Sequence, residues 1–221
     1  MELNNMKLNQ DYSEEENSCY IEEVRVGNRP FFFFIKRIFD IVFSVVSLIF
    51  MCIPMIVIAV VICIDSKGGA LYKQERLGKD GVPFMMYKFR SMYIDAESNG
   101  PRWAKKQDER ITRVGKFLRQ SRLDELPQFF NVIKGDMSVV GPRPEREYFY
   151  NKFETYIHGF RNRLAVRPGI TGWAQVNGGY ELRPEEKIEY DMEYIRRMSF
   201  RTDLSCIIRT VKLVFTHEGA R

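Results

Sequence analysis

An uninterrupted apolar run limits what this chain can fold into. From Ile41 to Ile64 the sequence contains no Asp, Glu, Lys or Arg. As a straight helix the run would be roughly 36 Å long, enough to cross a hydrocarbon core about 30 Å thick. A helix buried in a soluble protein is rarely apolar on every face for so long. A cleavable signal is disfavoured, because the preceding region is long and acidic and no small-x-small site follows. The run therefore predicts a membrane segment.

The flanks of this segment bear on its topology. Pro54 lies near the middle, where it deletes a helical hydrogen bond and clashes with the preceding turn. Basic residues lie on both sides of the run: Lys36 and Arg37 before it, then Lys67, Lys73 and Arg76 after it. Because positive residues favour the cytoplasmic side, a helix that breaks at Pro54 and leaves by the leaflet it entered satisfies both flanks. The alternative is an ordinary kinked span, which would place the remaining chain outside the cell.

Length and composition restrict the function classes. The 221 residues suit one domain with an appendage, and the net charge of +5 suggests an anionic partner: nucleic acid, phospholipid headgroups or a phosphorylated substrate. The four cysteines lack CxxC or metal-ligand spacing, which predicts free thiols. With two histidines, a His-rich zinc site or a Ser-His-Asp triad is disfavoured. Residues 1–30 are polar and acid-rich and predict a flexible tail.

After the membrane segment, "ALYKQERLGKDGVPFMMYKFRSM" predicts two extended stretches around a turn at 79–81. Alternation along the second stretch places Lys88 and Arg90 on one face. A solvated strand face is the simpler interpretation of that pair.

The segment 109–135 predicts two helices with a break between them. Ser121 or Asp124 can cap the second helix, with Pro127 in its first turn and Gly135 closing it. Asp124 and Glu125 would then lie at a helix N-terminus, which favours anions and can also receive a phosphate. Capping alone is the competing interpretation.

Two further motifs could contact phosphate. In "GPRP", prolines fix the backbone around Arg143, whose guanidinium matches phosphate oxygens. The alternative there is a rigid turn. The glycine-rich "VRPGITGWAQVNGG" has Arg167 at its start but is neither GxGxxG nor a Walker motif, so no nucleotide fold follows. The basic amphipathic stretch from 203 onward fits either a membrane surface or core packing.

Four segments in fixed order carry a resemblance: "KRIFDIVFSVVSL", "YKQERLGKDGVPFMMYKFRSM", "RVGKFLRQSRLDELPQFFNVIKGDMSVVGPRP" and "VRPGITGWAQVNG". From Phe33 to Phe215 the chain resembles the bacterial sugar transferases known as monotopic polyprenol-phosphate phosphoglycosyl transferases. The resemblance implies an α+β fold: a re-entrant membrane helix-break-helix over 31–66, and over 67–221 a mainly helical catalytic domain with a small β-hairpin and amphipathic interfacial helices.

The resemblance also implies a reaction. The family moves a sugar-1-phosphate from a UDP-sugar to polyprenol phosphate and releases UMP. By that similarity Asp124 is the nucleophile of a covalent phosphosugar-aspartyl intermediate and a ligand of Mg²⁺. Glu125 is the second member of the dyad, with metal binding and proton transfer both open. The residues expected to hold substrate phosphates are Arg119, Arg143 and Arg167, with Lys88 and Arg90 from the strand face.

The implied location is the bacterial inner membrane, with the catalytic part on the cytoplasmic face and no nucleic-acid partner; a homodimer is left open. Relatives often have Ser before the breaking proline, whereas this chain has Ile53. Longer relatives carry additional membrane spans at the N-terminus, so this chain is expected to be a short form of the family. The sequence does not specify which sugar is transferred, and a hexose-1-phosphate is the preferred expectation. Residues 180–186 are where we expect differences between enzymes that use different sugars. The rivals are a membrane glycosyltransferase that releases UDP and a membrane-anchored basic interaction protein.

Overall fold

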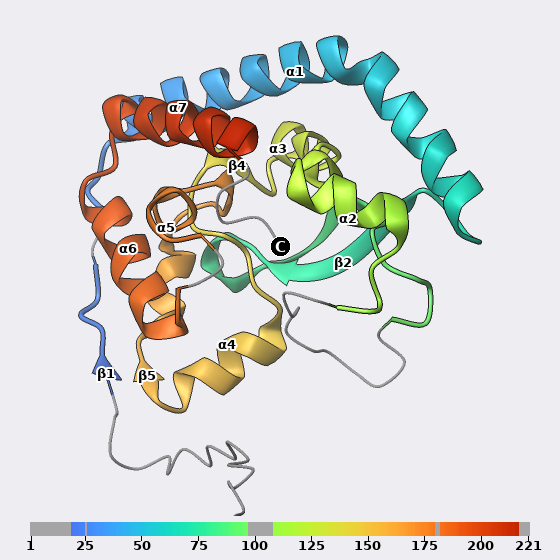
Figure 1. Ribbon diagram of the computed structural model, residues 1–221. Coiled ribbons are helices and arrows are strands. Elements are labelled where there is room, and N and C mark those ends of the chain that lie inside the picture. The colour runs from blue at the N-terminus through green and yellow to red at the C-terminus, as the bar shows by residue number, and fades with distance from the viewer. Residues whose placement is uncertain (1–18, 25, 97–107, 180–181, 217–221) are drawn as a thin grey trace, which may run out of the picture.

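The computed structural model describes residues 19–24, 26–96, 108–179 and 182–216, and over these the fold is α+β and rich in helix (Figure 1). The α-helices are α1 Pro30–Asp65, α2 Arg113–Gln120, α3 Gln128–Lys134, α4 Glu147–Glu154, α5 Trp173–Asn177, α6 Pro184–Arg196 and α7 Phe200–Thr216. The strands are β1 Cys19–Tyr20, β2 Leu71–Leu77, β3 Pro83–Phe89, β4 Ser138–Val140, β5 Ile157–His158 and β6 Gly169–Thr171. Short 3-10 turns are η1 Lys79–Gly81, η2 Leu123–Glu125 and η3 Phe160–Ala165.

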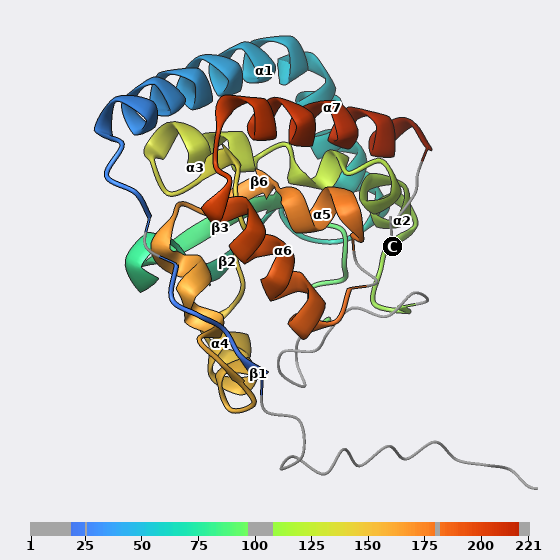
Figure 2. The same cartoon turned by 90° about the vertical axis from the view of Figure 1, so that its left-hand side faces the viewer.

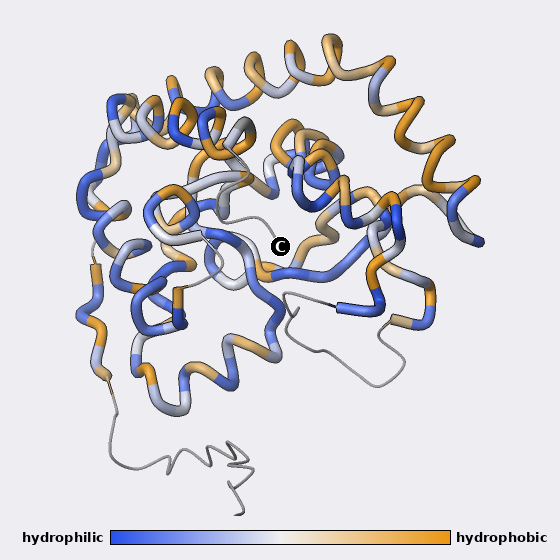
Figure 3. The backbone as a smooth tube through the Cα atoms, in the orientation of Figure 1, coloured by the Kyte–Doolittle hydropathy of each residue, from blue (hydrophilic) through white to orange (hydrophobic). Residues whose placement is uncertain are grey.

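The membrane segment forms α1, which among the described residues is the one helix long and apolar enough to cross a membrane. It runs along the top of the molecule, bends, and descends at the right-hand side of the view (Figure 1). The predicted break at Pro54 is wrong as a break, because the helix continues through this proline. A proline inside a helix removes one hydrogen bond and produces a bend rather than an obligatory end. Much of α1 is hydrophobic (Figure 3), and large apolar side chains such as Phe50, Ile53 and Ile64 are exposed.

The first turns of α1 are held by buried polar contacts. The Lys36 ammonium lies 2.6 Å from Asp203 Oδ2 of α7. Asp40 accepts hydrogen bonds from the Ser138 hydroxyl at 2.8 Å and the Val139 amide at 3.1 Å. An ionised side chain inside a membrane helix is costly unless it is paired, so these contacts place the beginning of α1 against the protein body.

The last turn of α1 contacts the same body. Ile62 packs with Phe89 of β3 and Leu118 of α2 in a small apolar cluster. The Asp65 carboxylate accepts a hydrogen bond from the Val114 amide at 3.3 Å. Both ends of a helix of 36 residues therefore attach to one folded unit.

The predicted hairpin is confirmed. β2 and β3 pair antiparallel, with Leu71 opposite Phe89 and Leu77 opposite Pro83. The connection is η1, in which Asp80 has a φ of 58° and allows the tight reversal. Helix α3 packs on β3, where the Asn131 amide donates to the Met85 carbonyl oxygen at 2.7 Å. The hairpin thereby forms one wall of the cavity described below.

The main core lies between the β4–β6 pair and helices α3, α4 and α6. β4 and β6 pair parallel, Ser138 with Gly169 and Val140 with Thr171. Near this pair the backbone at Gly169 lies very close to the backbone at Gly141. A Cβ on Gly169 would collide with the Gly141 backbone, so glycine is needed there. The largest buried side chains include Met137, Tyr150, Phe160, Ile188 and Tyr194.

Helix α7 confirms the amphipathic C-terminal stretch. Asp203 and Cys206 are buried, whereas Phe200, Leu204 and Ile208 are exposed. The helix lies on the same side of the molecule as the first half of α1 (Figures 1 and 2). The two helices meet where the Phe200 ring lies 4.9 Å from the Phe32 ring of α1.

Part of the segment predicted to be a flexible tail is instead paired. β1 lies parallel to β5, with Cys19 opposite Ile157 and Tyr20 opposite His158. The Tyr20 and His158 rings are 4.6 Å apart. An edge strand with free hydrogen-bonding groups accepts such an addition, which the composition of the segment could not indicate. Residues 1–18 of the predicted tail lie outside the described residues.

Candidate active site

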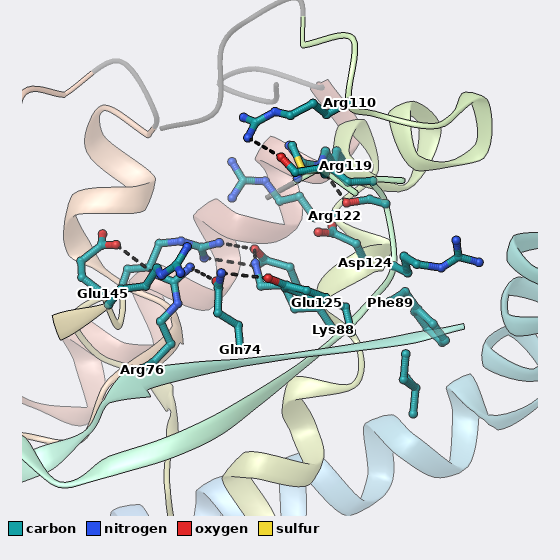
Figure 4. A pocket seen from close by; sticks show the side chains of 18 of the residues that line it. Gln74, Arg76, Lys88, Phe89, Arg110, Arg119, Arg122, Asp124, Glu125 and Glu145 are labelled. Carbon is teal, nitrogen blue, oxygen red and sulfur yellow. Dashed lines mark hydrogen bonds and ion pairs between the residues drawn. The ribbon is translucent and has the colours of Figure 1, made fainter. Parts of the chain in front are cut away.

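A cavity of about 520 Å³ lies between the β2–β3 hairpin, the α2–η2 turn, the Gly141–Pro144 segment and helices α4 to α6 (Figure 4). Among the described residues, the basic side chains that line it outnumber the acidic ones. The basic residues are Arg76, Lys88, Arg90, Arg110, Arg119, Arg122, Arg143, Arg146 and Lys187, and the acidic ones are Asp124, Glu125 and Glu145. The cavity is therefore suited to compounds with several phosphate charges.

Asp124 and Glu125 lie in the 3-10 turn η2, which differs from the predicted helix cap. Helix α3 begins at Gln128 with Pro127 in the capping position, so Asp124 does not cap it. The chain enters η2 through Arg122 in the left-handed region, with a φ of 57°. This reversal directs two consecutive carboxylates into the cavity, where both are buried.

Glu125 is held by two cations. The Lys88 ammonium lies 3.1 Å from Glu125 Oε1. The Arg143 guanidinium bonds to the same oxygen and lies 3.4 Å from Oε2. Burial opposes ionisation of Glu125, but Arg143 and Lys88 outweigh it and hold the pKa of Glu125 well below its usual range. Glu125 is therefore a permanent anion whose oxygens are both used.

Asp124 is the carboxylate that remains available. The side chain is buried, with 7% of its residue surface exposed. Among the described residues, none forms a hydrogen bond or ion pair with its carboxylate oxygens. Burial raises the pKa of Asp124 to about 6; the Lys88 ammonium acts in the opposite direction, and the Glu125 carboxylate adds to the rise. Asp124 is mostly ionised near neutral pH, and a desolvated, unpaired carboxylate is a better nucleophile than a hydrated one.

The other predicted phosphate ligands divide into two groups. Arg119 and Arg143 line the cavity, as does Lys88, and the Arg119 Nε donates to the Ser91 hydroxyl at 2.8 Å. Figure 4 shows Arg119 and Asp124 on the same side of the cavity. Arg167 is not among the lining residues; its Nε donates to the Gly135 carbonyl oxygen at 3.0 Å. The structure thus brings three of these cations to the carboxylates and leaves Arg167 elsewhere.

Arg90 lines the cavity, but its guanidinium serves the backbone. Its nitrogens donate to the carbonyl oxygens of Ser66, Lys67, Gly68 and Gly69 at 2.7 to 3.2 Å. These carbonyls belong to the C-cap of α1, Ser66, and to the three residues that follow it. Arg90 therefore fixes the exit of the membrane helix to the hairpin, and its predicted phosphate contact stays a prediction.

Sequence reasoning missed a second charged group in the cavity. Glu145 lies 3.1 Å from the Arg76 guanidinium and bonds to the Lys187 ammonium. These two cations oppose burial and lower the pKa of Glu145 to about 2. Glu145 directly follows the "GPRP" motif, and its position beside this motif could have marked it as a candidate site residue. Arg76 and Lys187 lie in β2 and α6, and no local pattern connects them.

The residues also bear on the Mg²⁺ predicted from the family resemblance. Among the described residues, no group of three His, Cys, Asp or Glu side chains could hold a metal alone. Mg²⁺, however, is usually held by one or two carboxylates together with substrate phosphates and water. Because both Glu125 oxygens are used, Asp124 is the carboxylate of the dyad that fits this role.

The fold and the cavity define a membrane-associated α+β protein with paired carboxylates in a cationic cavity beside its membrane helix. The family model described as "Bacterial sugar transferase" matches residues 31–217. The chain belongs to this family.

Three relatives show the range of the family. The chain is 44% identical over 208 residues to the UDP-N-acetylgalactosamine-undecaprenyl-phosphate N-acetylgalactosaminephosphotransferase of Aeromonas hydrophila, a match covering 91% of this chain and 49% of the relative. It is 44% identical over 190 residues to the UDP-glucose:undecaprenyl-phosphate glucose-1-phosphate transferase of Klebsiella pneumoniae, covering 84% and 41%. It is 38% identical over 202 residues to the undecaprenyl-phosphate galactose phosphotransferase of Salmonella typhimurium, covering 85% and 42%. The chain thus spans at most about half the length of these curated relatives.

Proposed function

We propose that the protein transfers a sugar-1-phosphate from a UDP-sugar to polyprenol phosphate at a membrane surface and releases UMP. The observation that carries this proposal is the unequal carboxylate pair: Glu125 is ion-paired on both oxygens, while Asp124 is buried and unpaired beside three cations. The names of the relatives, which include undecaprenyl-phosphate sugar phosphotransferases, support the same reaction.

In the first step an Asp124 carboxylate oxygen attacks the sugar-proximal phosphorus of the donor. The bond from that phosphorus to the bridging oxygen breaks, and the bridging oxygen leaves with UMP. The product is an acyl phosphate, a mixed anhydride between the Asp124 carboxyl group and the sugar phosphate. Lys88, Arg119 and Arg143 line the cavity where negative charge builds up on the transferring group, and preorganised cations in a site of low dielectric stabilise such charge.

In the second step an oxygen of polyprenol phosphate attacks the same phosphorus. The bond to Asp124 breaks and the carboxylate is restored, leaving a polyprenyl diphosphate sugar. The cavity borders the end of α1 through Gly69, Leu71, Phe89 and Ile94, of which three are apolar side chains. A lipid phosphate can therefore approach the carboxylates from the membrane side while its chain stays in an apolar environment.

Mg²⁺, held by Asp124 and the donor phosphates, would neutralise charge on the diphosphate. The protein's own share is to keep Asp124 ionised and unpaired and to hold Arg143 toward the transferring phosphate through Glu125. This division of roles assigns Glu125 to positioning.

We further propose that α1 enters and leaves the same leaflet, with the cavity on the cytoplasmic face. Supporting this, Asp40 near its start and Asp65 at its end bond to the same folded unit. A helix that spanned the bilayer would place these ends on opposite sides. Protease or tag accessibility of both flanks, in membrane vesicles of known orientation, tests the topology; flanks on opposite sides would refute it.

The reaction is tested with the purified chain, polyprenol phosphate, Mg²⁺ and a panel of UDP-sugars including UDP-glucose, UDP-galactose and UDP-N-acetylgalactosamine. We expect UMP as the nucleotide product and a mass adduct of one phosphosugar on the peptide that contains Asp124. Release of UDP would instead identify a glycosyltransferase that leaves the phosphate behind. A membrane-anchored interaction protein would release neither, and Asp124→Asn would then have no effect.

A further inference from the structure

Gln175 lines the cavity with an amide group that has no partner. It lies in α5 and is 8% exposed. Both its Nε2 and its Oε1 are buried without a hydrogen bond to the protein. Leaving a buried amide unsatisfied is unfavourable, so such groups in folded proteins usually meet water or a ligand. Neither catalytic step described above uses this residue.

The packing of α5 creates this position. Gly172 precedes the helix, and a Cβ there would collide with the Gly141 carbonyl oxygen and lie 2.8 Å from Gln175 Oε1. The absence of a side chain at Gly172 therefore lets the glutamine fold against the segment that leads into Arg143. A carboxamide held in this way presents one donor and one acceptor side by side.

The cavity that Gln175 lines also carries side chains of two other kinds. Ala174, Phe149 and Leu182 supply apolar surface. Arg146 and Lys187 supply positive charge. An amide, an aromatic ring and cations together match a nucleoside phosphate: hydrogen bonds for the edge of the base, apolar contact for its face and cations for the phosphates.

We propose that Gln175 binds the uracil of the donor nucleotide, with Nε2–H donating to a ring carbonyl oxygen and Oε1 accepting from the ring N3–H. This inference rests on the proposed function, since it assumes a UDP-sugar donor. Residues 180–181, part of the segment predicted to set sugar preference, lie outside the described residues.

Binding of UMP and CMP to the full chain in detergent micelles, measured by calorimetry, tests the proposal without turnover. Gln175→Met keeps the size of the side chain and removes both hydrogen bonds, so UMP affinity should fall about tenfold or more. Gln175→Glu offers acceptors only, which suits the amino group of cytosine and not the uracil carbonyl. The ratio of UMP to CMP affinity should therefore fall in this variant.

Gln128→Met is the matched control. Gln128 is also a buried glutamine whose amide lacks a partner, but it does not line the cavity. We expect it to leave the ratio of UMP to CMP affinity unchanged. Thermal unfolding of each variant checks that α5 is intact, and Gln175→Glu retains a polar side chain should the methionine variant fail to fold.

Unchanged UMP affinity in folded Gln175→Met would overturn the inference. So would a variant that binds UMP normally but changes the preference between UDP-glucose and UDP-N-acetylgalactosamine, because the amide would then face the sugar. In either case wild-type turnover with UMP release would leave the proposed function standing. A wild-type chain that releases no UMP from any donor would refute the function itself.

Discussion

The replacement Glu125→Gln separates the roles left open for this carboxylate. It keeps the shape of the side chain and removes the charge that Lys88 and Arg143 share. Breaking a buried ion pair by removing one partner costs about 3–5 kcal/mol. The cations are each 17% exposed at the side chain and reach water, and Asp124 lies beside them, so we expect about 2 kcal/mol here.

The effect on activity follows from the geometry. Without its partner, Arg143 is no longer held toward the transferring phosphate, and a misplacement of about 1 Å costs on the order of a hundredfold in rate. The Mg²⁺ concentration for half-maximal activity should stay within about twofold of wild type, because Glu125 oxygens are used by cations and not by the metal.

The pH profile provides a second measurement. The acid limb of kcat/KM should belong to Asp124, whose pKa is raised to about 6, and activity should rise as pH increases through that region. In Glu125→Gln a carboxylate that raises the pKa of Asp124 is gone while Lys88 and Arg143 remain, so the limb should move to lower pH. A large increase in the Mg²⁺ requirement, or a limb that moves to higher pH, would refute the positioning role.

Three further variants test other parts of the structure. Asp124→Asn should lower turnover by about a thousandfold or more and abolish the adduct, with UMP still bound in calorimetry; substantial remaining turnover would exclude it as nucleophile. Asp203→Asn leaves the Lys36 ammonium with Asp40 at 3.8 Å as its remaining partner, and should destabilise the protein by about 2–3 kcal/mol in thermal unfolding in detergent. An unchanged melting temperature would contradict this role of the ion pair. Arg90→Met should lower the free energy of unfolding by about 2–4 kcal/mol, because the carbonyls after α1 lose their donor. It should also increase proteolysis after α1, with the donor KM changed less than kcat. A variant of full stability that is defective only in donor binding would show that Arg90 binds phosphate.

The sequence predicted those elements correctly that depend mainly on interactions between residues close in the chain. The charge-free run predicted the membrane segment because a helix in hydrocarbon must be apolar on every face. The Lys79–Gly81 turn between alternating stretches predicted the β2–β3 hairpin, and the order of the motifs predicted the family. The effect of Pro54 was overestimated, since α1 continues through it. The loss of one helical hydrogen bond can bend a helix without ending it.

The carboxylate pair shows where local information ended. Asp124 and Glu125 are adjacent and chemically alike, so the residues alone predicted that they share a site. The family resemblance implied different roles for them, but not the difference in their ion-pair partners. Lys88 and Arg143 reach Glu125 from a strand and a loop that are separate in the chain, and they leave Asp124 unpaired.

The same reason explains the cations. By sequence, Arg90 and Arg167 were as suitable for phosphate as Arg143, and Arg76 and Lys187 gave no signal. Which of them faces the cavity depends on how β2, β3, α6 and the end of α1 pack together. Residue types and their order are written in the sequence, whereas burial, partner and direction are produced by contacts between distant segments, and for this protein only the tertiary structure decided them.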